Sequence, residues 1–313
     1  MSVAFTFPGQ GSQHVGMGRA LAGAFASARE VFQEVDDALS QNLSRLMWEG
    51  PEDELTLTEN AQPALMAVSL AALRVLERDA GLDLGEAAEF VGGHSLGEYS
   101  ALAAAGMFSL SDTARLLKTR GRAMQVAVPV GEGAMAALLG LDLEAARAVA
   151  EEAAQGDVCA PANDNAPGQV VISGARAAID RALEIARDKG ARRAMLLPVS
   201  APFHCALMAP AAEVMARALE EVEVSDPVVP LVANISATAV GDAAAIRAGL
   251  VEQVTGMVRW RESVAFMADA GVSRLYEIGA GKVLSGLARR IDRELETVAV
   301  GTPEDIEAVA GDV

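Results

Sequence analysis

The stretch EFVGGHSLGEYSALAAAG, residues 89–106, places Ser95 in a G-x-S-x-G frame between a strand-like run and a helix-like run. A sharp strand-to-helix turn exposes a serine hydroxyl, and Gly93 and Gly97 are small enough to permit one. The helix that follows would direct free N–H groups toward anything bound beside the serine. Ser95 and Glu98 also fit the S-x-x-E capping box, so the pattern alone leaves two roles open, a nucleophile or a helix cap.

Strands and helices alternate on both sides of this turn. An apolar strand at 3–7 leads into a glycine-rich loop, and helical periodicity follows at 15–39 and 60–81. A further helix is expected at 111–125, with Ser111 or Asp112 as its N-cap. This alternation predicts an α/β fold with a mainly parallel sheet.

The middle of the chain has a different order of elements. It reads as strand, helix, strand, strand, helix and strand at 133–140, 142–155, 157–163, 169–174, 175–190 and 191–199. This βαββαβ order is the split-βαβ or ferredoxin-like plan. The alternating pattern then resumes, with helices at 205–222, 242–256, 260–270 and 281–291 and strands at 229–235, 273–279 and 297–300. We therefore predict a body formed by residues 1–128 and 200–313, with a small subdomain inserted at 129–199.

The composition favours an ordered cytoplasmic protein. Hydrophobic residues make up 51% and charged residues 22% of the chain, and the net charge of −18 argues against a nucleic-acid partner. We expect no secretory signal, because the first residues lack a basic start, and no membrane span, because no apolar run is long enough. The two cysteines, Cys159 and Cys205, suggest neither a disulfide framework nor a metal cluster, and we expect no metal or redox cofactor.

A nucleophilic serine needs a base, and the chain has only three histidines. His94 should point away from its neighbour Ser95, whereas His14 lies in the glycine-rich loop and could line the site. His204 lies on a loop between a strand and a helix, where it could face a cleft. No aspartate between Ser95 and His204 has the pattern of a buried orienting acid, so we expect a dyad whose imidazole is held by a backbone carbonyl.

One arginine lies on the apolar side of the helix at 111–125. At roughly 3.6 residues per turn, Arg120 lies about 50° from the centre of the apolar face, while Arg115 and Arg122 project to the opposite side. A buried guanidinium needs an anionic partner. That partner is either an internal carboxylate or a substrate carboxylate gripped bidentately, and Gly121 would leave room for such a ligand.

Seven motifs in order carry a family resemblance: FPGQGSQ (7–13), GHSLGEYSAL (93–102), TRGRAMQ (119–125), NDNAPGQVVISG (163–174), PFHCALM (202–208), QVTGMVRW (253–260) and EIGAGKVLSGL (277–287). Together they resemble the malonyl-CoA:acyl carrier protein transacylases, the S-malonyltransferases of bacterial type II fatty acid synthesis. The resemblance covers essentially the whole chain. It implies an α/β-hydrolase-like body with a parallel sheet and a ferredoxin-like insert.

The resemblance implies catalytic roles at matching positions. Ser95 would be the acylated nucleophile and His204 its general base and acid. A backbone carbonyl at or near Gln253 would orient the imidazole. The backbone amides of Gln10 and Leu96 would form the oxyanion hole.

The resemblance also implies a substrate-binding set. Arg120 would hold the malonyl carboxylate, and Asn163 and Asn165 would lie near the cleft between the two subdomains. Members of the family often have serine where this chain has Ala166, and small or polar residues where it has Phe203. In related polyketide acyltransferases, phenylalanine at this position accompanies malonyl rather than methylmalonyl selection, because it crowds the α-methyl group. A role beside a polyketide synthase therefore stays open.

The implied substrates are malonyl-CoA and the phosphopantetheine thiol of acyl carrier protein, and we expect a monomer. Because carrier proteins are acidic, docking needs a local basic patch, for which there are two candidate clusters: Lys189, Arg192 and Arg193, or Lys282, Arg289 and Arg290. A serine hydrolase is the nearest alternative, although it would not need an arginine on an apolar face. A non-catalytic scaffold of the same fold is a further alternative.

Overall fold

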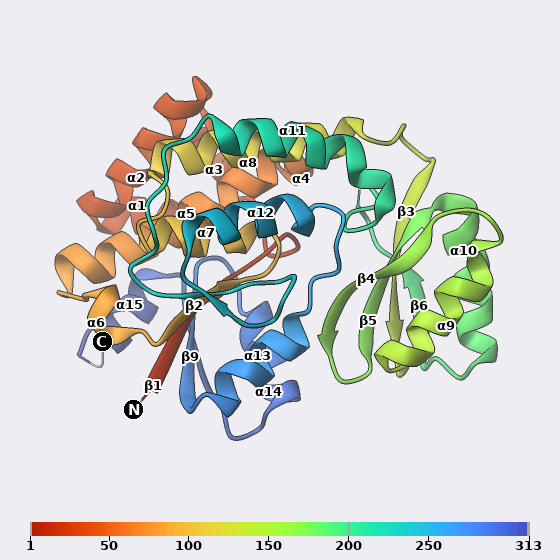
Figure 1. Ribbon diagram of the computed structural model, residues 1–313. Helices are drawn as coiled ribbons and strands as arrows, with labels where there is room; N and C mark the ends of the chain where they lie inside the picture. Colours follow the sequence, from red (N-terminus) through yellow and green to blue (C-terminus); the bar gives the residue numbers. More distant parts are fainter. Residues whose placement is uncertain (1, 200, 312–313) are drawn as a thin grey trace.

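The computed structural model describes residues 2–199 and 201–311, and its strands form two separate sheets (Figure 1). The larger sheet has the order β10-β9-β1-β2-β7-β8, and all its pairs are parallel except β7 with β8. Its strands are β1 (Ser2–Phe7), β2 (Phe90–Gly93), β7 (Leu231–Val232), β8 (Ala239–Val240), β9 (Val272–Ile278) and β10 (Glu296–Val300). The predicted α/β class with a mainly parallel sheet is confirmed.

The helices of the body lie on both sides of this sheet, some directly on it and others packed on those helices. They are α1 (Arg19–Ala24), α2 (Ala26–Leu39), α3 (Leu43–Glu49), α4 (Glu52–Thr56), α5 (Thr58–Asp79), α6 (Leu84–Ala87), α7 (Leu96–Ala104), α8 (Leu110–Val126), α11 (Ala209–Glu220), α12 (Ala243–Gln253), α13 (Trp260–Asp269), α14 (Val283–Ile291) and α15 (Pro303–Val309), with a 3-10 turn, η1 (Ala206–Met208), before α11. Side chains alternate between faces along a strand, so Phe5 and Phe7 of β1 pack into the core under α2, α5 and α8. Ala4 faces the second core, under α13 and α14.

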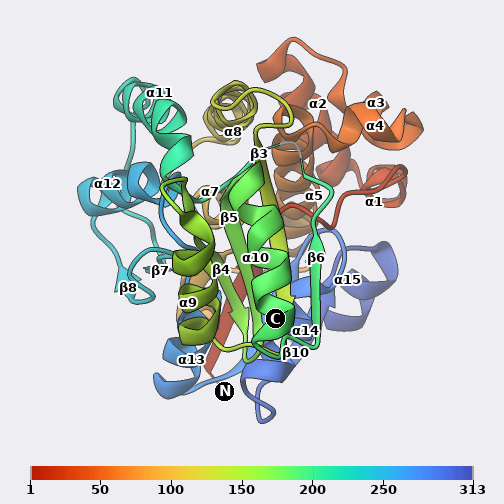
Figure 2. The ribbon, with the colours of Figure 1, turned by 90° about the vertical axis from the view of Figure 1, so that its right-hand side faces the viewer.

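The smaller sheet is antiparallel and has the order β4-β5-β3-β6. Its elements follow the predicted β-α-β-β-α-β order: β3 (Gly133–Leu139), α9 (Leu143–Ala154), β4 (Cys159–Ala166), β5 (Gln169–Ala175), α10 (Arg176–Asp188) and β6 (Arg193–Leu196). Figure 2 views this sheet from the side that α9 and α10 cover, and these helices enclose a separate hydrophobic core. The domain limits at 129 and 199 stay a prediction, and residues 1, 200, 312 and 313 of the predicted body lie outside the described residues.

Some local predictions were wrong. The segment 15–39 forms two helices, because Phe25 has an extended backbone between α1 and α2. The N-cap of α8 is Ser109 rather than Ser111 or Asp112, and its hydroxyl accepts the Asp112 N–H at 3.0 Å. The strand predicted at 229–235 is reduced to β7, because main-chain hydrogen bonds from Ala233 to Thr238 and from Ala237 to Ala233 close a turn into β8.

Parallel pairing of β1 with β2 fixes the position of the site. Phe7 is the register partner of Gly93, so the two strands end side by side. The glycine-rich loop after β1 and the Ser95 turn after β2 therefore leave the same edge of the sheet. Crevices at the carboxyl ends of parallel strands are where α/β folds bind ligands.

Candidate active site

Ser95 lies between β2 and α7 in a strained backbone conformation, with φ 55° and ψ −108°. A Cβ atom on Gly93 would lie 2.0 Å from the main chain of Gly97, and one on Gly97 would lie 2.1 Å from the carbonyl oxygen of Phe7. Only glycine fits at either position. The two glycines therefore let the turn pack tightly against the end of β1.

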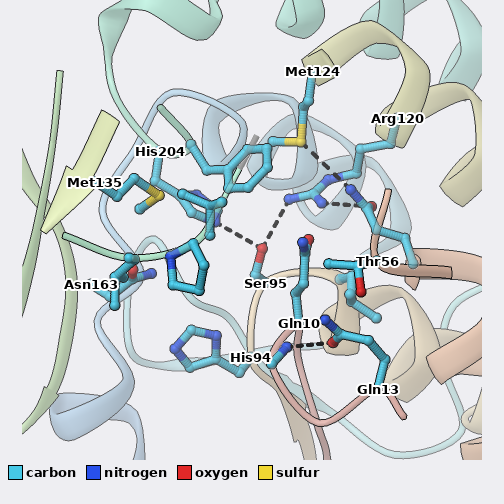
Figure 3. A pocket seen from close by; sticks show the side chains of 17 residues that line it. Gln10, Gln13, Thr56, His94, Ser95, Arg120, Met124, Met135, Asn163 and His204 are labelled. Atoms are coloured by element: carbon cyan, nitrogen blue, oxygen red, sulfur yellow. Dashed lines mark hydrogen bonds between the residues drawn. The ribbon is translucent and has the colours of Figure 1, made fainter. Parts of the chain in front are cut away.

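The Ser95 side chain does not cap α7. Ser95 occupies the N-cap position, but its hydroxyl makes no capping hydrogen bond. Figure 3 shows this hydroxyl between two other groups: Oγ lies 2.8 Å from Nε2 of His204 and accepts a hydrogen bond from Nη2 of Arg120 at 3.1 Å. Of the two roles that the sequence left open, the geometry supports the nucleophile.

His204 is buried and oriented by a backbone carbonyl. Its Nδ1 lies 2.8 Å from the main-chain oxygen of Gln253, as expected for a dyad without an acid. Burial lowers the pKa of His204 to about 3, and the positive charge of Arg120 acts in the same direction. The imidazole is therefore neutral near pH 7. With the Nδ1 proton donated to the carbonyl, Nε2 can accept the proton of Ser95.

Arg120 is a buried cation held by neutral groups. Its side chain is 1% exposed, Nη1 donates to Oε1 of Gln62 at 2.8 Å, and Nη2 donates to Oε1 of Gln253 at 2.7 Å. The guanidinium also lies 5.6 Å from the ring centre of Tyr99. Among the described residues no carboxylate forms an ion pair with Arg120, so the internal salt bridge that the sequence allowed is absent from this part of the chain.

The room beside Arg120 does not come from Gly121. A Cβ atom on Gly121 would lie 2.5 Å from Cα of Glu59 and 2.7 Å from the carbonyl oxygen of Thr58. The expectation that this glycine leaves space for a ligand was therefore wrong. It lets the start of α5 approach α8, which brings Gln62 of α5 within reach of Arg120.

A cavity of about 420 Å³ opens beside Ser95, His204 and Arg120. Among its lining residues are four of the predicted set, Gln10, Leu96, Asn163 and Phe203, and the apolar side chains of Met124, Met135 and Leu197. The lining therefore combines a few polar groups with apolar side chains, which is the usual composition of a small-molecule site.

Two residues that the sequence placed at or near the site, Asn165 and His14, make no contact with the Ser95 hydroxyl. Oδ1 of Asn165 lies 2.8 Å from Nε2 of His94, so this pair lies beside the turn and His94 does not serve as the base. Burial lowers the pKa of His94. His14 lines a separate cavity of about 390 Å³ with Lys282, contrary to the suggestion that it could line the site.

Asn234 and Glu98 support the turn, and the sequence did not identify either role. Oδ1 of Asn234 accepts the Ser95 N–H at 2.8 Å, and its Nδ2 donates to the Gly93 carbonyl at 2.7 Å. The Glu98 carboxylate accepts the Asn234 N–H at 3.0 Å and a hydrogen bond from Nε2 of Gln253. A polar residue in an apolar run is the signal that the sequence offers for Asn234, while the S-x-x-E pattern of Glu98 indicates a capping box.

Gln62 is a further contact that the sequence did not predict. Its Nε2 donates to the Thr58 hydroxyl at 2.9 Å, and this hydroxyl donates to Oε1 of Gln10 at 3.0 Å. A chain of hydrogen bonds therefore links the loop after β1 to Arg120. Gln62 lies in the apolar run of α5, so its unusual polarity was the only signal in the sequence.

Two further properties of the described residues bear on other kinds of site. No group of three or more histidine, cysteine, aspartate or glutamate side chains in residues 2–199 and 201–311 could hold a metal ion. None of the helices in this part of the chain is both long enough and apolar enough to cross a membrane.

A mixed α/β body that presents a serine at a strand-to-helix turn, within reach of a neutral histidine, is the arrangement of enzymes that pass acyl groups through a serine. Residues 4–292 match the model of the acyl transferase domain, and the chain belongs to this family and is an acyltransferase. The chain is 46% identical over 306 residues to the malonyl CoA-acyl carrier protein transacylase of Bacillus subtilis (strain 168), covering 97% of this chain and 95% of the relative.

Solved structures give the same result. The acyl-carrier-protein S-malonyltransferase of Bartonella henselae superposes with a TM-score of 0.97 at 58% identity, covering 99% of this chain and all of that one. A malonyl-transacylase solved in complex with a type II PKS acyl-carrier protein superposes with a TM-score of 0.96 at 43% identity, covering 100% of both chains.

Proposed function

We propose that this protein transfers the malonyl group of malonyl-CoA to the phosphopantetheine thiol of acyl carrier protein, as a step of fatty acid biosynthesis. The group would pass through an ester on Ser95. The observation that carries this proposal is the Arg120 guanidinium, which is buried, lacks a carboxylate partner among the described residues and lies 3.1 Å from the Ser95 hydroxyl. The names of the relatives support the same substrates.

In the first half-reaction, Oγ of Ser95 attacks the thioester carbonyl while Nε2 of His204 takes the hydroxyl proton. The carbonyl oxygen becomes an oxyanion between the loop after β1 and the start of α7, where the backbone amides of Gln10 and Leu96 would donate to it. The C–S bond then breaks, and the coenzyme A thiolate takes the proton from His204. The product is malonyl-Ser95.

In the second half-reaction, the phosphopantetheine thiol gives its proton to His204 and attacks the ester carbonyl. When the tetrahedral intermediate collapses, the Ser95 oxygen leaves and recovers the proton. His204 therefore serves as base and then as acid in each half. Its low pKa keeps the imidazole unprotonated at neutral pH.

Arg120 would select the acyl group. A malonyl carboxylate could accept hydrogen bonds from the guanidinium next to the reacting carbonyl, whereas an acetyl group would leave the guanidinium without a hydrogen-bonded anion. Asn163 and Phe203 line the same cavity and would contact the substrate. Asn165 would act on the substrate only indirectly, through His94.

Intact-mass spectrometry tests both half-reactions. The protein should gain one malonyl group when mixed with malonyl-CoA and lose it to phosphopantetheinylated acyl carrier protein. Ser95→Ala should lower transfer by roughly 10⁴-fold or more and abolish the adduct. Loss of the malonyl group to water at the same rate with and without carrier protein would indicate a hydrolase and contradict the proposal.

A second variant tests selection by charge. Arg120→Ala should lower the preference for malonyl-CoA over acetyl-CoA by roughly 100-fold, because it removes two charge-assisted hydrogen bonds to the carboxylate. Arg122→Ala is the matched control, since Arg122 lies on the exposed side of α8 and pairs with Glu59. An unchanged preference in Arg120→Ala would overturn the assignment of Arg120.

The finer features of the protein stay proposals. We propose that the body is α/β-hydrolase-like, that the insert is ferredoxin-like, and that the protein works in the cytoplasm as a monomer without a metal or redox cofactor.

Each of the two candidate docking clusters has a side chain that is engaged within the protein. Lys189 pairs with Glu152 at 2.9 Å, and Arg290 donates to Gln169. Arg192 and Arg193 are exposed and remain our candidates for carrier-protein contact.

A further inference from the structure

Glu98 is a buried carboxylate that the proposed reaction does not use. Its side chain, on the first turn of α7, is 3% exposed. One oxygen accepts the main-chain N–H of Asn234 at 3.0 Å, and the other accepts a hydrogen bond from Nε2 of Gln253. A capping role is excluded, because this carboxylate reaches across to two other segments rather than back to the amide at the start of its own helix.

The two partners of Glu98 hold the backbone of Ser95 from both sides. Asn234 accepts the Ser95 N–H through Oδ1 at 2.8 Å, and Gln253 donates to the Ser95 carbonyl through Nε2 at 2.9 Å. Ser95 has a strained φ of 55°, and strain of this kind persists only where the surroundings fix it. Both hydrogen bonds that fix it depend on residues anchored by one carboxylate.

The same carboxylate sets the direction of the Gln253 amide. A carboxylate only accepts hydrogen bonds, so it requires the NH₂ of Gln253 on its side and places Oε1 toward Arg120, which donates to it at 2.7 Å. The main-chain oxygen of Gln253 accepts from His204 at 2.8 Å. Glu98 therefore acts, through Gln253, on the base and on the guanidinium together.

We propose that Glu98 is the positioning residue of the acyl-transfer site. Through Asn234 and Gln253 it fixes the relative positions of Ser95, His204 and Arg120. This inference rests on the proposed malonyl transfer. Glu98 is not among the residues that line the cavity, and its carboxylate accepts from Asn234 and Gln253 rather than from the reacting hydroxyl. It acts by fixing one amide direction and one strained turn.

Glu98→Gln is the direct test, because the new side chain keeps the size but presents an NH₂ to the NH₂ of Gln253. Either the new amide turns and presents its NH₂ to the Asn234 N–H, or the Gln253 amide turns and presents its NH₂ to Arg120. We expect kcat for malonyl loading to fall roughly 10- to 100-fold, with a lower malonyl-to-acetyl preference. The matched control is Glu277→Gln, since Glu277 is also buried and accepts two main-chain N–H groups, those of Leu284 and Ser285, away from this cavity.

The pH profile gives a readout that a purely structural role would not move. Burial raises the pKa of Glu98 to about 7, and the charged and titratable groups that face it are Arg120 of α8 and Tyr99 of its own helix. Burial and the positive charge of Arg120 lower the pKa of His204 to about 3, so we assign an acid limb near neutrality to Glu98. With malonyl-N-acetylcysteamine, a thioester without phosphates, kcat/KM of the wild-type protein should fall as the pH drops through about 7. Glu98→Gln should show a lower, flat profile.

The outcomes separate this inference from the proposed function. Wild-type protein that takes up no malonyl group would refute the function itself. If wild-type protein is loaded normally but Glu98→Gln matches Glu277→Gln in kcat and in malonyl preference, the positioning role is wrong. An acid limb of the wild-type profile that persists unchanged in Glu98→Gln would also overturn it.

Discussion

Two strand-to-helix turns follow the strands on either side of β1. They differ in whether a side chain caps the start of the helix. After β9, the buried Glu277 carboxylate accepts the N–H groups of Leu284 and Ser285 at 3.0 and 2.7 Å, so the first turn of α14 is satisfied from within the protein. After β2, the side chain of Ser95 makes no capping bond to α7 and faces the cavity instead.

The difference shows that the same kind of strand-to-helix turn stabilises the fold after β9 and presents a reactive group after β2. A capped helix start gains stability, because donors that would otherwise lack a partner are paired. At α7 the N–H groups of Gly97 and Glu98 donate to the main-chain oxygens of His94 and Ser95. The partial positive charge of the helix start still faces the cavity, where it can act on a bound anion or oxyanion. At the β2 turn the carboxylate, Glu98, is used to hold Asn234 and Gln253 rather than the helix start.

The largest effect is expected where the reactive turn is tightest. In Gly97→Ala the new Cβ atom would lie 2.1 Å from the Phe7 carbonyl oxygen, so either β1 or Ser95 must move. We expect a loss of roughly 3 kcal/mol in the free energy of unfolding, measured by urea titration. Malonyl transfer should fall roughly 100-fold, because a shift of about 1 Å disturbs the reacting geometry. Wild-type activity would mean that the turn tolerates displacement.

The next largest effect is expected at the turn after β9, where a substitution should lower stability but not malonyl transfer. Glu277→Gln leaves one of two buried N–H groups facing an NH₂, so we expect a loss of roughly 1.5–3 kcal/mol in the free energy of unfolding. Transfer measured well below the unfolding temperature should stay within about twofold of wild type, since this turn does not line the cavity at Ser95. A large fall in malonyl preference would contradict the division of roles between the turns.

The sequence predicted the reactive turn better than its supports. Glycine spacing around Ser95, the inward position of Arg120 and the small number of histidines identified three groups that do converge, with distances of 2.8 and 3.1 Å around the Ser95 hydroxyl. Local periodicity also gave the βαββαβ order of the small sheet.

What the sequence did not supply depends on contacts between distant segments. Gln62, Asn234 and Glu98 come from α5, the loop after β7 and α7, and no local pattern tells which polar group each will meet. The same applies to Gly121, whose missing side chain serves helix packing rather than ligand access. Such roles appear only when the chain is folded, because hydrogen-bond partners of buried groups are set by tertiary packing.

The smallest effect tests whether α14 is free of functional constraint. Gly286 lies on the exposed side of α14, and a Cβ atom there would meet nothing within 4 Å. Because glycine inside a helix costs conformational entropy, Gly286→Ala should raise the free energy of unfolding by about 0.5–1 kcal/mol and leave malonyl transfer unchanged. Thermal unfolding and a transfer assay measure the two quantities. A stabilised variant with impaired transfer would show that α14 takes part in carrier-protein or substrate binding. In that case the turn before α14 could no longer be called purely structural, in contrast to the reactive turn that contains Gly97.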